Sequence, residues 1–204
     1  FAMIKEFYNL IMKQFIFLLV LFLFSNCFPF ISNLEMPTVK QGVLDISGWD
    51  FEEDASIPLN GDWEFYWNEL ISPNENPESL TKKRTGYLRP GIIWEGQEVN
   101  GRLLQGTGYA TYKATIVFPE SSIGTLFGLK FSTTGGPAYK IFMNETLIGE
   151  FGKVGTSKDN MIPTRIADLV WFTVTKQRMD LILQISNFHH ASGTFWYPPY
   201  LTTY

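Results

Sequence analysis

The sequence is poor in the residues that build covalent cross-links and metal sites. It contains one cysteine, Cys27, and two histidines, His189 and His190, in 204 residues. A single cysteine cannot form a disulfide within the chain. The histidines are adjacent, so on a strand they would point to opposite faces, and no further ligands stand at metal-binding spacing. We therefore expect no metal site and no cofactor.

The sequence also has few charges. Charged residues make up 18% of the chain, the formal net charge is -4, and no run of like charge is longer than Lys82-Lys83-Arg84. Proteins that bind nucleic acid neutralise its phosphates with clustered lysines and arginines. The composition therefore argues against nucleic acid as a partner.

The motifs of common enzyme classes are missing as well. The sequence has no Gly-x-Ser-x-Gly, no dinucleotide fingerprint and no phosphate-binding loop of Walker spacing. Two carboxylates could in principle cleave a glycosidic bond. The acidic residues, however, stand mainly in turns such as Glu52-Glu53-Asp54, where solvation explains them better. We predict that the chain is not an enzyme.

Aromatic residues, in contrast, are abundant, at 16% of the chain. Aromatic side chains favour half-buried strands, and short alternating segments separated by turn residues recur along the sequence. The clearest runs from Tyr109 to Phe118, and its more apolar set, which includes Ala110 and Tyr112, is expected to face the core. About eight to ten such strands predict an all-β fold, a jelly roll or a related two-sheet β-sandwich.

Other segments fit the same pattern. The alternation of Trp63–Trp67 predicts a strand, and Ala138–Met143 with Thr146–Phe151 predicts a hairpin around Asn144-Glu145. Further strands are expected at Leu126–Phe131, Leu169–Val174 and Met179–Ser186.

Two segments are expected to lie outside the regular strands. Ser72–Arg84 is polar and contains two prolines, which predicts a surface loop. Phe195–Leu201 is expected to be a final edge element, because Pro198 and Pro199 lack the N–H groups that a central strand needs.

A short hydrophobic run precedes the strands. Phe15–Phe24 is uninterrupted and apolar, and it stands between Met12-Lys13 and Ser25-Asn26-Cys27. This pattern is typical of a secretory leader of the bacterial lipoprotein type. Cys27 would then be lipidated, although Asn26 departs from the small residue usual at that place. An uncleaved membrane anchor and a buried core helix are the alternatives, and such a run spans about 15 Å, roughly half of the hydrocarbon core.

Three segments follow from these patterns. Residues 1–27 are expected to be a leader helix that acts as a signal peptide or lipoprotein anchor, residues 28–41 a tether, and residues 42–204 the β-sandwich. The expected localisation is outside the cytoplasm, on the periplasmic side of a bacterial membrane, with attachment through the leader or a lipid.

Candidate ligand-binding residues stand near the end of the sequence. His189, His190 and Trp196 are close together, and Asn187 and Gln184 precede them. An aromatic ring beside imidazoles and amides can stack on a sugar while the polar groups bind its hydroxyls. The alternative is that Trp196 fills the core and that the histidines are ordinary surface residues.

Two cations could complete this site. Lys153 and Arg165 border the polar loop 152–163, and either could hold an anion or a carboxylate. The set of candidate ligand-binding residues is therefore His189, His190, Trp196, Lys153 and Arg165.

Several motifs, in order along the chain, resemble a known family. They are Leu44–Phe51, Pro58–Trp67, Gly108–Tyr112, Gly152–Gly155 and Asn187–His190. Together they resemble the extracytoplasmic sensor domain of bacterial 7TM-DISM receptors, which are seven-transmembrane receptors with diverse intracellular signalling modules. The resemblance covers about residues 42–201 and implies a galactose-binding-like jelly roll, similar to the sugar-binding domain that accompanies family 2 glycoside hydrolases.

The resemblance implies a non-catalytic, ligand-sensing domain of a membrane signalling receptor, which binds a carbohydrate-like small molecule. The sequence ends at Tyr204, so the domain is expected here without its transmembrane and output modules, and a transmembrane signalling module encoded nearby is a candidate partner. Two alternatives stand beside this interpretation. One is an exported structural or adhesive domain that binds protein, and the other is an accessory carbohydrate-binding domain of a glycosidase.

Overall fold

The computed structural model describes Met12, Gln14 and residues 35–51, 56–131, 137–164, 169–190 and 197–203. The chain divides into two compact units, Phe1–Glu35 and Met36–Tyr204. In the first unit, Met12 and Gln14 are helical and exposed, whereas Cys27 and most of the expected leader lie outside the described residues. None of the described helices combines the length and the hydropathy that a membrane span requires.

The second unit consists mainly of strands. The described strands are β1 (Val43–Asp45), β2 (Ser56–Pro58), β3 (Trp63–Trp67), β4 (Gly86–Leu88), β5 (Glu98–Val99), β6 (Arg102–Leu103), β7 (Gly108–Val117), β8 (Leu126–Lys130), β9 (Ala138–Met143), β10 (Thr146–Phe151), β11 (Leu169–Thr173), β12 (Arg178–Asn187) and β13 (Tyr200–Thr203). Two short helices accompany them, α2 (Pro77–Lys83) and the 3-10 helix η1 (Glu120–Ser122).

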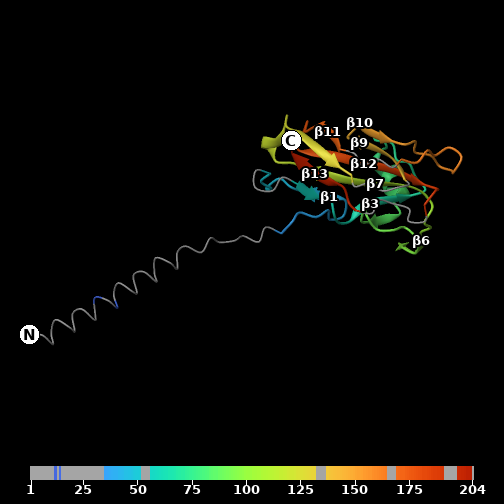
Figure 1. The fold of residues 1–204 in the computed structure, drawn as a ribbon, viewed down its shortest axis with the longest axis horizontal. Helices are drawn as coiled ribbons and strands as arrows, with labels where there is room; N and C mark the ends of the chain where they lie inside the picture. Colours follow the sequence, from blue (N-terminus) through green and yellow to red (C-terminus); the bar gives the residue numbers. More distant parts are fainter. Residues whose placement is uncertain are drawn as a thin grey trace, which may run out of the picture. The chain divides into compact units, whose positions relative to one another are not determined.

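The strands form two main sheets, which confirms the expected all-β sandwich. The larger sheet has the order β10-β9-β12-β7-β3-β4, with β1 paired in parallel to β7, and Figure 1 shows β10, β9, β12, β7 and β3 in this order. The smaller sheet has the order β11-β8-β13-β2, and β5 pairs with β6 separately. The other pairings in both sheets are antiparallel.

Aromatic side chains join the two sheets. Phe118, which follows β7 of the larger sheet, lies 5.3 Å from Phe127 and 6.2 Å from Phe172 of the smaller sheet, measured between ring centroids. All three rings are buried, and the contacts are edge-on, as aromatic pairs prefer. The high aromatic content therefore serves the core between the sheets.

The strands with strong alternation are confirmed. On β7, Ala110 and Tyr112 are buried and belong to the core, whereas Thr111 and Lys113 point to the other face of the sheet. The hairpin of β9 and β10 turns at Asn144-Glu145 as expected, and Asn144 adopts a positive φ of 51°. At β7 and at the β9–β10 hairpin, the side-chain alternation and the turn expected from the sequence therefore match the structure.

The segment expected to be a surface loop contains helix α2. The side chain of Asn76 caps the helix by accepting a hydrogen bond from the Ser79 backbone N–H at 2.8 Å, and Pro77 occupies the first helical position. The expectation of a loop was wrong there because no residue of α2 is buried, so the helix carries no apolar period.

The last strand also differs from expectation. β13 pairs with both β2 and β8, so it lies inside the smaller sheet and is not an edge strand. The two prolines precede the strand, and the carbonyl of Pro199 accepts a hydrogen bond from Leu59 N–H at 2.8 Å. Their missing N–H groups therefore leave the strand ladder intact.

The packed unit begins earlier than Gly42, the expected boundary. Val39 is 1% exposed and forms a parallel bridge with Gly61. The Val39 N–H donates to the Asn60 carbonyl at 2.7 Å, and the Asp62 N–H donates to the Val39 carbonyl at 2.8 Å. Gly61 has a φ of +114°, and a Cβ added there would lie 2.1 Å from the Val39 carbonyl oxygen.

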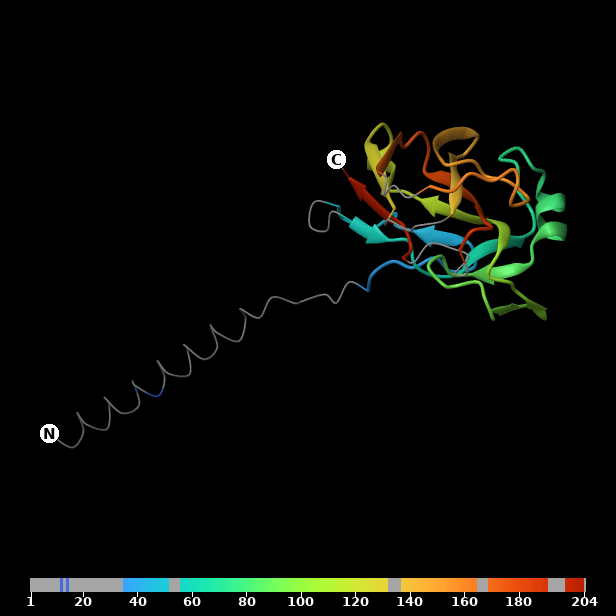
Figure 2. The same cartoon turned by 45° about the vertical axis from the view of Figure 1, so that its right-hand side comes forward.

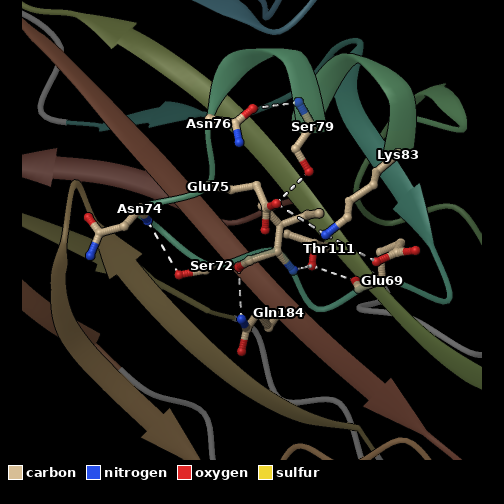
Figure 3. Close-up of polar contacts among 10 residues, drawn as sticks. Glu69, Ser72, Asn74, Glu75, Asn76, Ser79, Lys83, Thr111 and Gln184 are labelled. Carbon is tan, nitrogen blue, oxygen red and sulfur yellow. Dashed lines mark hydrogen bonds and ion pairs between the residues drawn. The ribbon is translucent and has the colours of Figure 1, made fainter.

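Residues of the segment 69–83 lie against the outer face of the larger sheet at Thr111 and Gln184 (Figure 3). Thr111 on β7 accepts a hydrogen bond from the Ile71 N–H at 3.0 Å and donates to the Glu69 carbonyl at 2.8 Å. Gln184 on β12 donates to the Ile71 carbonyl at 2.9 Å. Figure 2 shows α2, in green, on the opposite side of the domain from β13, in red.

Glu75 holds α2 to this segment. Its carboxylate accepts a hydrogen bond from the Ser79 hydroxyl, and it lies 3.2 Å from the Lys83 ammonium (Figure 3). These partners lower the pKa of Glu75 below its ordinary value, with the Ser79 bond as the larger cause. The contacts of Glu75 with Ser79 and Lys83 therefore hold α2 against the segment that precedes it.

We expect Gly61→Ala to lower the free energy of unfolding by about 2–4 kcal/mol, because the new methyl group meets the Val39 backbone and the φ is unfavourable. Chemical denaturation of the purified chain measures the change. Gly48→Ala is the control, because no atom lies within 4 Å of a Cβ added at Gly48. Equal stability of the two variants would contradict the close contact between Val39 and Gly61.

We expect Glu75→Gln to destabilise the chain at neutral pH and to have less effect in acid. The folded-state pKa of Glu75 is lowered, so its carboxylate contributes stability above the unfolded-state pKa, and this contribution is lost as the pH falls through the folded-state value. Unfolding measured between pH 7 and pH 3 tests the trend. A stability difference that does not change with pH would argue against the role of the Glu75 charge.

Candidate functional site

The histidines of the expected site lie in a turn after β12. His189 and His190 are exposed, and both backbone N–H groups donate to Oδ1 of Asn187, at 3.3 Å and 3.0 Å. The Asn187 amide nitrogen donates to the carbonyls of Gly106 and His190. Asn187 is itself 1% exposed, so it shapes the turn and does not reach a ligand, contrary to the role expected for its amide.

Lys153 lies at the same end of the sandwich. β10 and β12 both run antiparallel to β9, so their last residues, Phe151 and Asn187, point the same way. The loop after β10 contacts the end of β12, where the Gly155 N–H donates to the Ser186 hydroxyl at 3.1 Å. Lys153 is exposed, and its backbone pairs with Ile162.

The other residues of the expected site are not described. Arg165, Trp196 and Cys27 lie outside the described residues. Gln184 is described, but its amide nitrogen is used to bind the Ile71 carbonyl. The structure thus brings His189, His190 and Lys153 to one end of the sandwich, and their role in ligand binding stays a prediction. No cluster of three metal-ligating side chains occurs among the residues that the structure describes.

A second surface, not expected from the sequence, covers the outside of the smaller sheet. The strand register places residues of β11, β8 and β13 side by side there: Trp171 is paired with Gly128 and Gly128 with Thr202, while Leu169 is paired with Lys130 and Lys130 with Tyr200. We call this surface the aromatic face, and its residues are Leu126, Gly128, Lys130, Leu169, Trp171, Thr173, Tyr200 and Thr202.

Exposed rings distinguish the aromatic face. Trp171 is 37% exposed and Tyr200 is 36% exposed, and Leu126 and Leu169 are exposed beside them. Their strand neighbours Val170 and Phe172 are buried in the core. Since side chains alternate along a strand, Trp171 faces away from the core.

A glycine determines how Trp171 lies. A Cβ added to Gly128 would stand 2.9 Å from the six-membered ring of Trp171, 2.9 Å from the Leu169 side chain and 3.1 Å from that of Thr202. The indole therefore lies across the strand at the point where β8 has no side chain. Any larger residue at Gly128 would displace it.

A groove adjoins the aromatic face at the end of the sandwich opposite the histidines. It has a volume of about 370 Å³, within the range of small-molecule sites. The beginnings of β8, β10 and β12 and the ends of β9 and β11 surround it, and its lining residues are Leu126, Met143, Asn144, Thr146, Ile148, Trp171, Phe172, Thr173, Thr175 and Met179.

The groove combines an indole with hydroxyl groups. Thr146, Thr173 and Thr175 are exposed at it. The side chain of Asn144 is held in place, because its Oδ1 accepts a hydrogen bond from the Asp180 N–H at 3.0 Å. This arrangement can bind a small polar ring that has one apolar face.

The sequence contained a signal for this surface that was not decisive. The strand Leu169-Val170-Trp171-Phe172-Thr173 was expected, but both alternating sets include apolar residues. Alternation alone therefore could not show whether Trp171 or Phe172 would enter the core.

Comparison with known proteins gives partial structural likenesses. No protein-family model matches the sequence, and no curated protein matches it. A Faecalibacterium prausnitzii beta-glucuronidase is 15% identical with a TM-score of 0.47, covering 66% of this chain and 21% of that chain. A GH2 beta-galacturonidase from Eisenbergiella tayi, bound to galacturonate, is 10% identical with a TM-score of 0.47, covering 72% and 24%.

A Bacteroides uniformis beta-glucuronidase is 14% identical with a TM-score of 0.48, covering 72% of this chain and 17% of that chain. This chain therefore spans about a fifth of the length of these enzymes. Likenesses of this extent assign no activity to it.

We expect Gly128→Ala to move the Trp171 ring while the sandwich stays folded. The added methyl group would stand 2.9 Å from the indole, and the exposed ring can swing outward into solvent. The indole N–H signal of Trp171 in a proton–nitrogen NMR spectrum should shift, and Gly96→Ala, at an open but positive-φ position, is the control for glycine replacement. An unchanged signal would contradict the placement of Trp171 over Gly128.

Proposed function

We propose that this chain is a non-catalytic carbohydrate-binding domain of an exported protein and that its ligand stacks on Trp171. The observation that carries the proposal is the half-exposed indole beside a groove of about 370 Å³ with hydroxyl groups at its edge. A pyranose ring has an apolar C–H face that packs on an aromatic ring, while its hydroxyls need hydrogen-bonding partners.

The groove offers such partners. The threonine hydroxyls at positions 146, 173 and 175 can donate or accept. The Asn144 amide is oriented by its bond to Asp180, so its nitrogen is available as a fixed donor. A site that is ordered before binding loses less entropy when the ligand arrives.

The chemistry of the groove favours binding over catalysis. Among the residues that the structure describes, its lining contains no carboxylate, imidazole, thiol or amine. Cleavage of a glycosidic bond needs two carboxyl groups at the sugar, and general acid–base catalysis needs a group that can transfer a proton. The side chains that line this groove can recognise a sugar but supply no such group.

The proposed sugar binding is compatible with two kinds of protein, a receptor and a glycosidase. If the 7TM-DISM resemblance holds, the domain is the periplasmic sensor of a receptor; the second candidate is an accessory domain of a glycosidase, the class of the solved neighbours. The coding sequence around this chain separates them: several apolar spans in the continuing frame indicate a receptor, and a catalytic domain indicates a glycosidase. Export and lipidation at Cys27 remain part of the proposal in both settings.

We expect Trp171→Ala to weaken oligosaccharide binding by about tenfold, which corresponds to about 1.4 kcal/mol, because it removes the stacking surface. Binding is first detected on an array of plant and bacterial oligosaccharides and is then measured by calorimetry with the best ligand. Tyr87→Ala is the matched control, because Tyr87 is also a ring on an outer face, 36% exposed, but belongs to β4 of the larger sheet.

Replacement of the histidines tests the other end of the sandwich. A His189→Ala, His190→Ala double variant should bind like the unchanged protein if the ligand lies on Trp171. If the double variant loses sugar binding while Trp171→Ala binds normally, the site at Trp171 is wrong. The site expected from the sequence is then favoured. Circular dichroism of each variant shows whether it is folded.

A further inference from the structure

Lys130 lies among the rings of the aromatic face. It is exposed at the end of β8, and the strand register sets it between Leu169 on one side and Tyr200 on the other. Gly128, two residues before it on the same side of the strand, is paired with Trp171. Lys130 therefore stands one row along the sheet from the proposed stacking ring.

Lys130 differs from the other lysines of the described strands in its ionic contacts. On the outer face of the larger sheet, Lys113 lies 3.2 Å from Asp180, and Lys140 lies 3.2 Å from Glu150. Lys130 forms no ion pair with any residue that the structure describes, and the described part of the aromatic face contains no carboxylate. In a chain with a formal net charge of -4, this face presents a cation.

The spacing of the face exceeds a single sugar ring. At about 3.4 Å per residue along a strand, Lys130 is about 7 Å from the Trp171 row and about 14 Å from Leu126, which borders the groove. These are distances between backbone rows, and a ligand that extends past the Trp171 ring comes within reach of the long, flexible side chain of Lys130. A second sugar unit along the strand direction would reach it.

We propose that the ligand is an anionic oligosaccharide, with one ring on Trp171 and a carboxylate or sulfate of a neighbouring unit bound by Lys130. This inference rests on the proposed carbohydrate-binding function and names its ligand class. Charge complementarity supports it, because a lysine ammonium beside apolar rings is well suited to bind an anionic group on a ligand that covers those rings. Tyr200 contributes its ring on the far side of Lys130.

The test uses one sugar backbone with and without its charge. Calorimetry with the full 204-residue chain compares tetragalacturonate with the same tetrasaccharide in methyl-esterified form, at low and at high salt. We expect the acid to bind roughly three- to fivefold more tightly at low salt, the size of an exposed ion pair, and the difference to shrink at high salt. A sulfated galactan tetrasaccharide shows whether a sulfate replaces the carboxylate.

Variants then assign the preference to Lys130. Lys130→Gln should remove the difference between acid and ester, and Lys130→Glu should reverse it. Lys40→Gln is the control, because Lys40 is an exposed lysine away from the aromatic face. Trp171→Ala should weaken both forms of the sugar.

The outcomes separate the inference from the proposed function. Equal binding of acid and ester, or a preference that survives in Lys130→Gln, overturns the anionic ligand and leaves carbohydrate binding in place. If the oligosaccharide array and both tetrasaccharides show no binding, the carbohydrate function falls as well. The aromatic face would then be a docking surface for a protein.

Discussion

Alternation along β11 is the constraint on which the candidate site depends. A strand in a two-layer sandwich can give only every second side chain to the core. Val170 and Phe172 occupy those positions, and Phe172 contacts Phe118 across the two sheets. Leu169 and Trp171 must then lie outside, although both are strongly apolar. The exposed indole follows from the packing of its neighbours.

The outer faces of the two sheets differ in the side chains that they expose. The larger sheet carries ion pairs on its outside, such as Lys113 with Asp180, and residues 69–83 are fastened over it by Thr111 and Gln184 (Figure 3). The outer face of the smaller sheet, as far as it is described, instead exposes Trp171 and Tyr200 together with Lys130. Exposed apolar surface beside a groove with a few polar groups is a common property of binding sites, and this contrast directs attention to the smaller sheet.

Much of the fold could be predicted where local signals were sufficient. The alternation in β7 and the tight turn at Asn144-Glu145 identify their strands without tertiary information. Helix α2 was missed because none of its residues is buried and it has no apolar period, although Asn76 and Pro77 are a local signal for the start of a helix. The position of β13 was missed because Pro198 and Pro199 precede the strand and do not interrupt it.

The candidate site was less predictable than the fold. His189, His190 and Lys153 do come to one end of the sandwich, because β10 and β12 both run antiparallel to β9 and therefore end on the same side. Trp171 and Lys130 were inside predicted strands, but nothing in their own segments indicated that they share a face. That knowledge requires the register between β11 and β8.

The sequence by itself determined the all-β class and excluded a disulfide within the chain, because strand alternation, turn residues and the number of cysteines are local or compositional properties. Only the tertiary structure decided which apolar side chains point outward and which strands are neighbours. Lys130, Trp171 and Tyr200 come from three strands that are distant along the chain. They meet because backbone hydrogen bonds hold β11, β8 and β13 in one register. Such long-range pairing cannot be predicted from any short segment of the sequence.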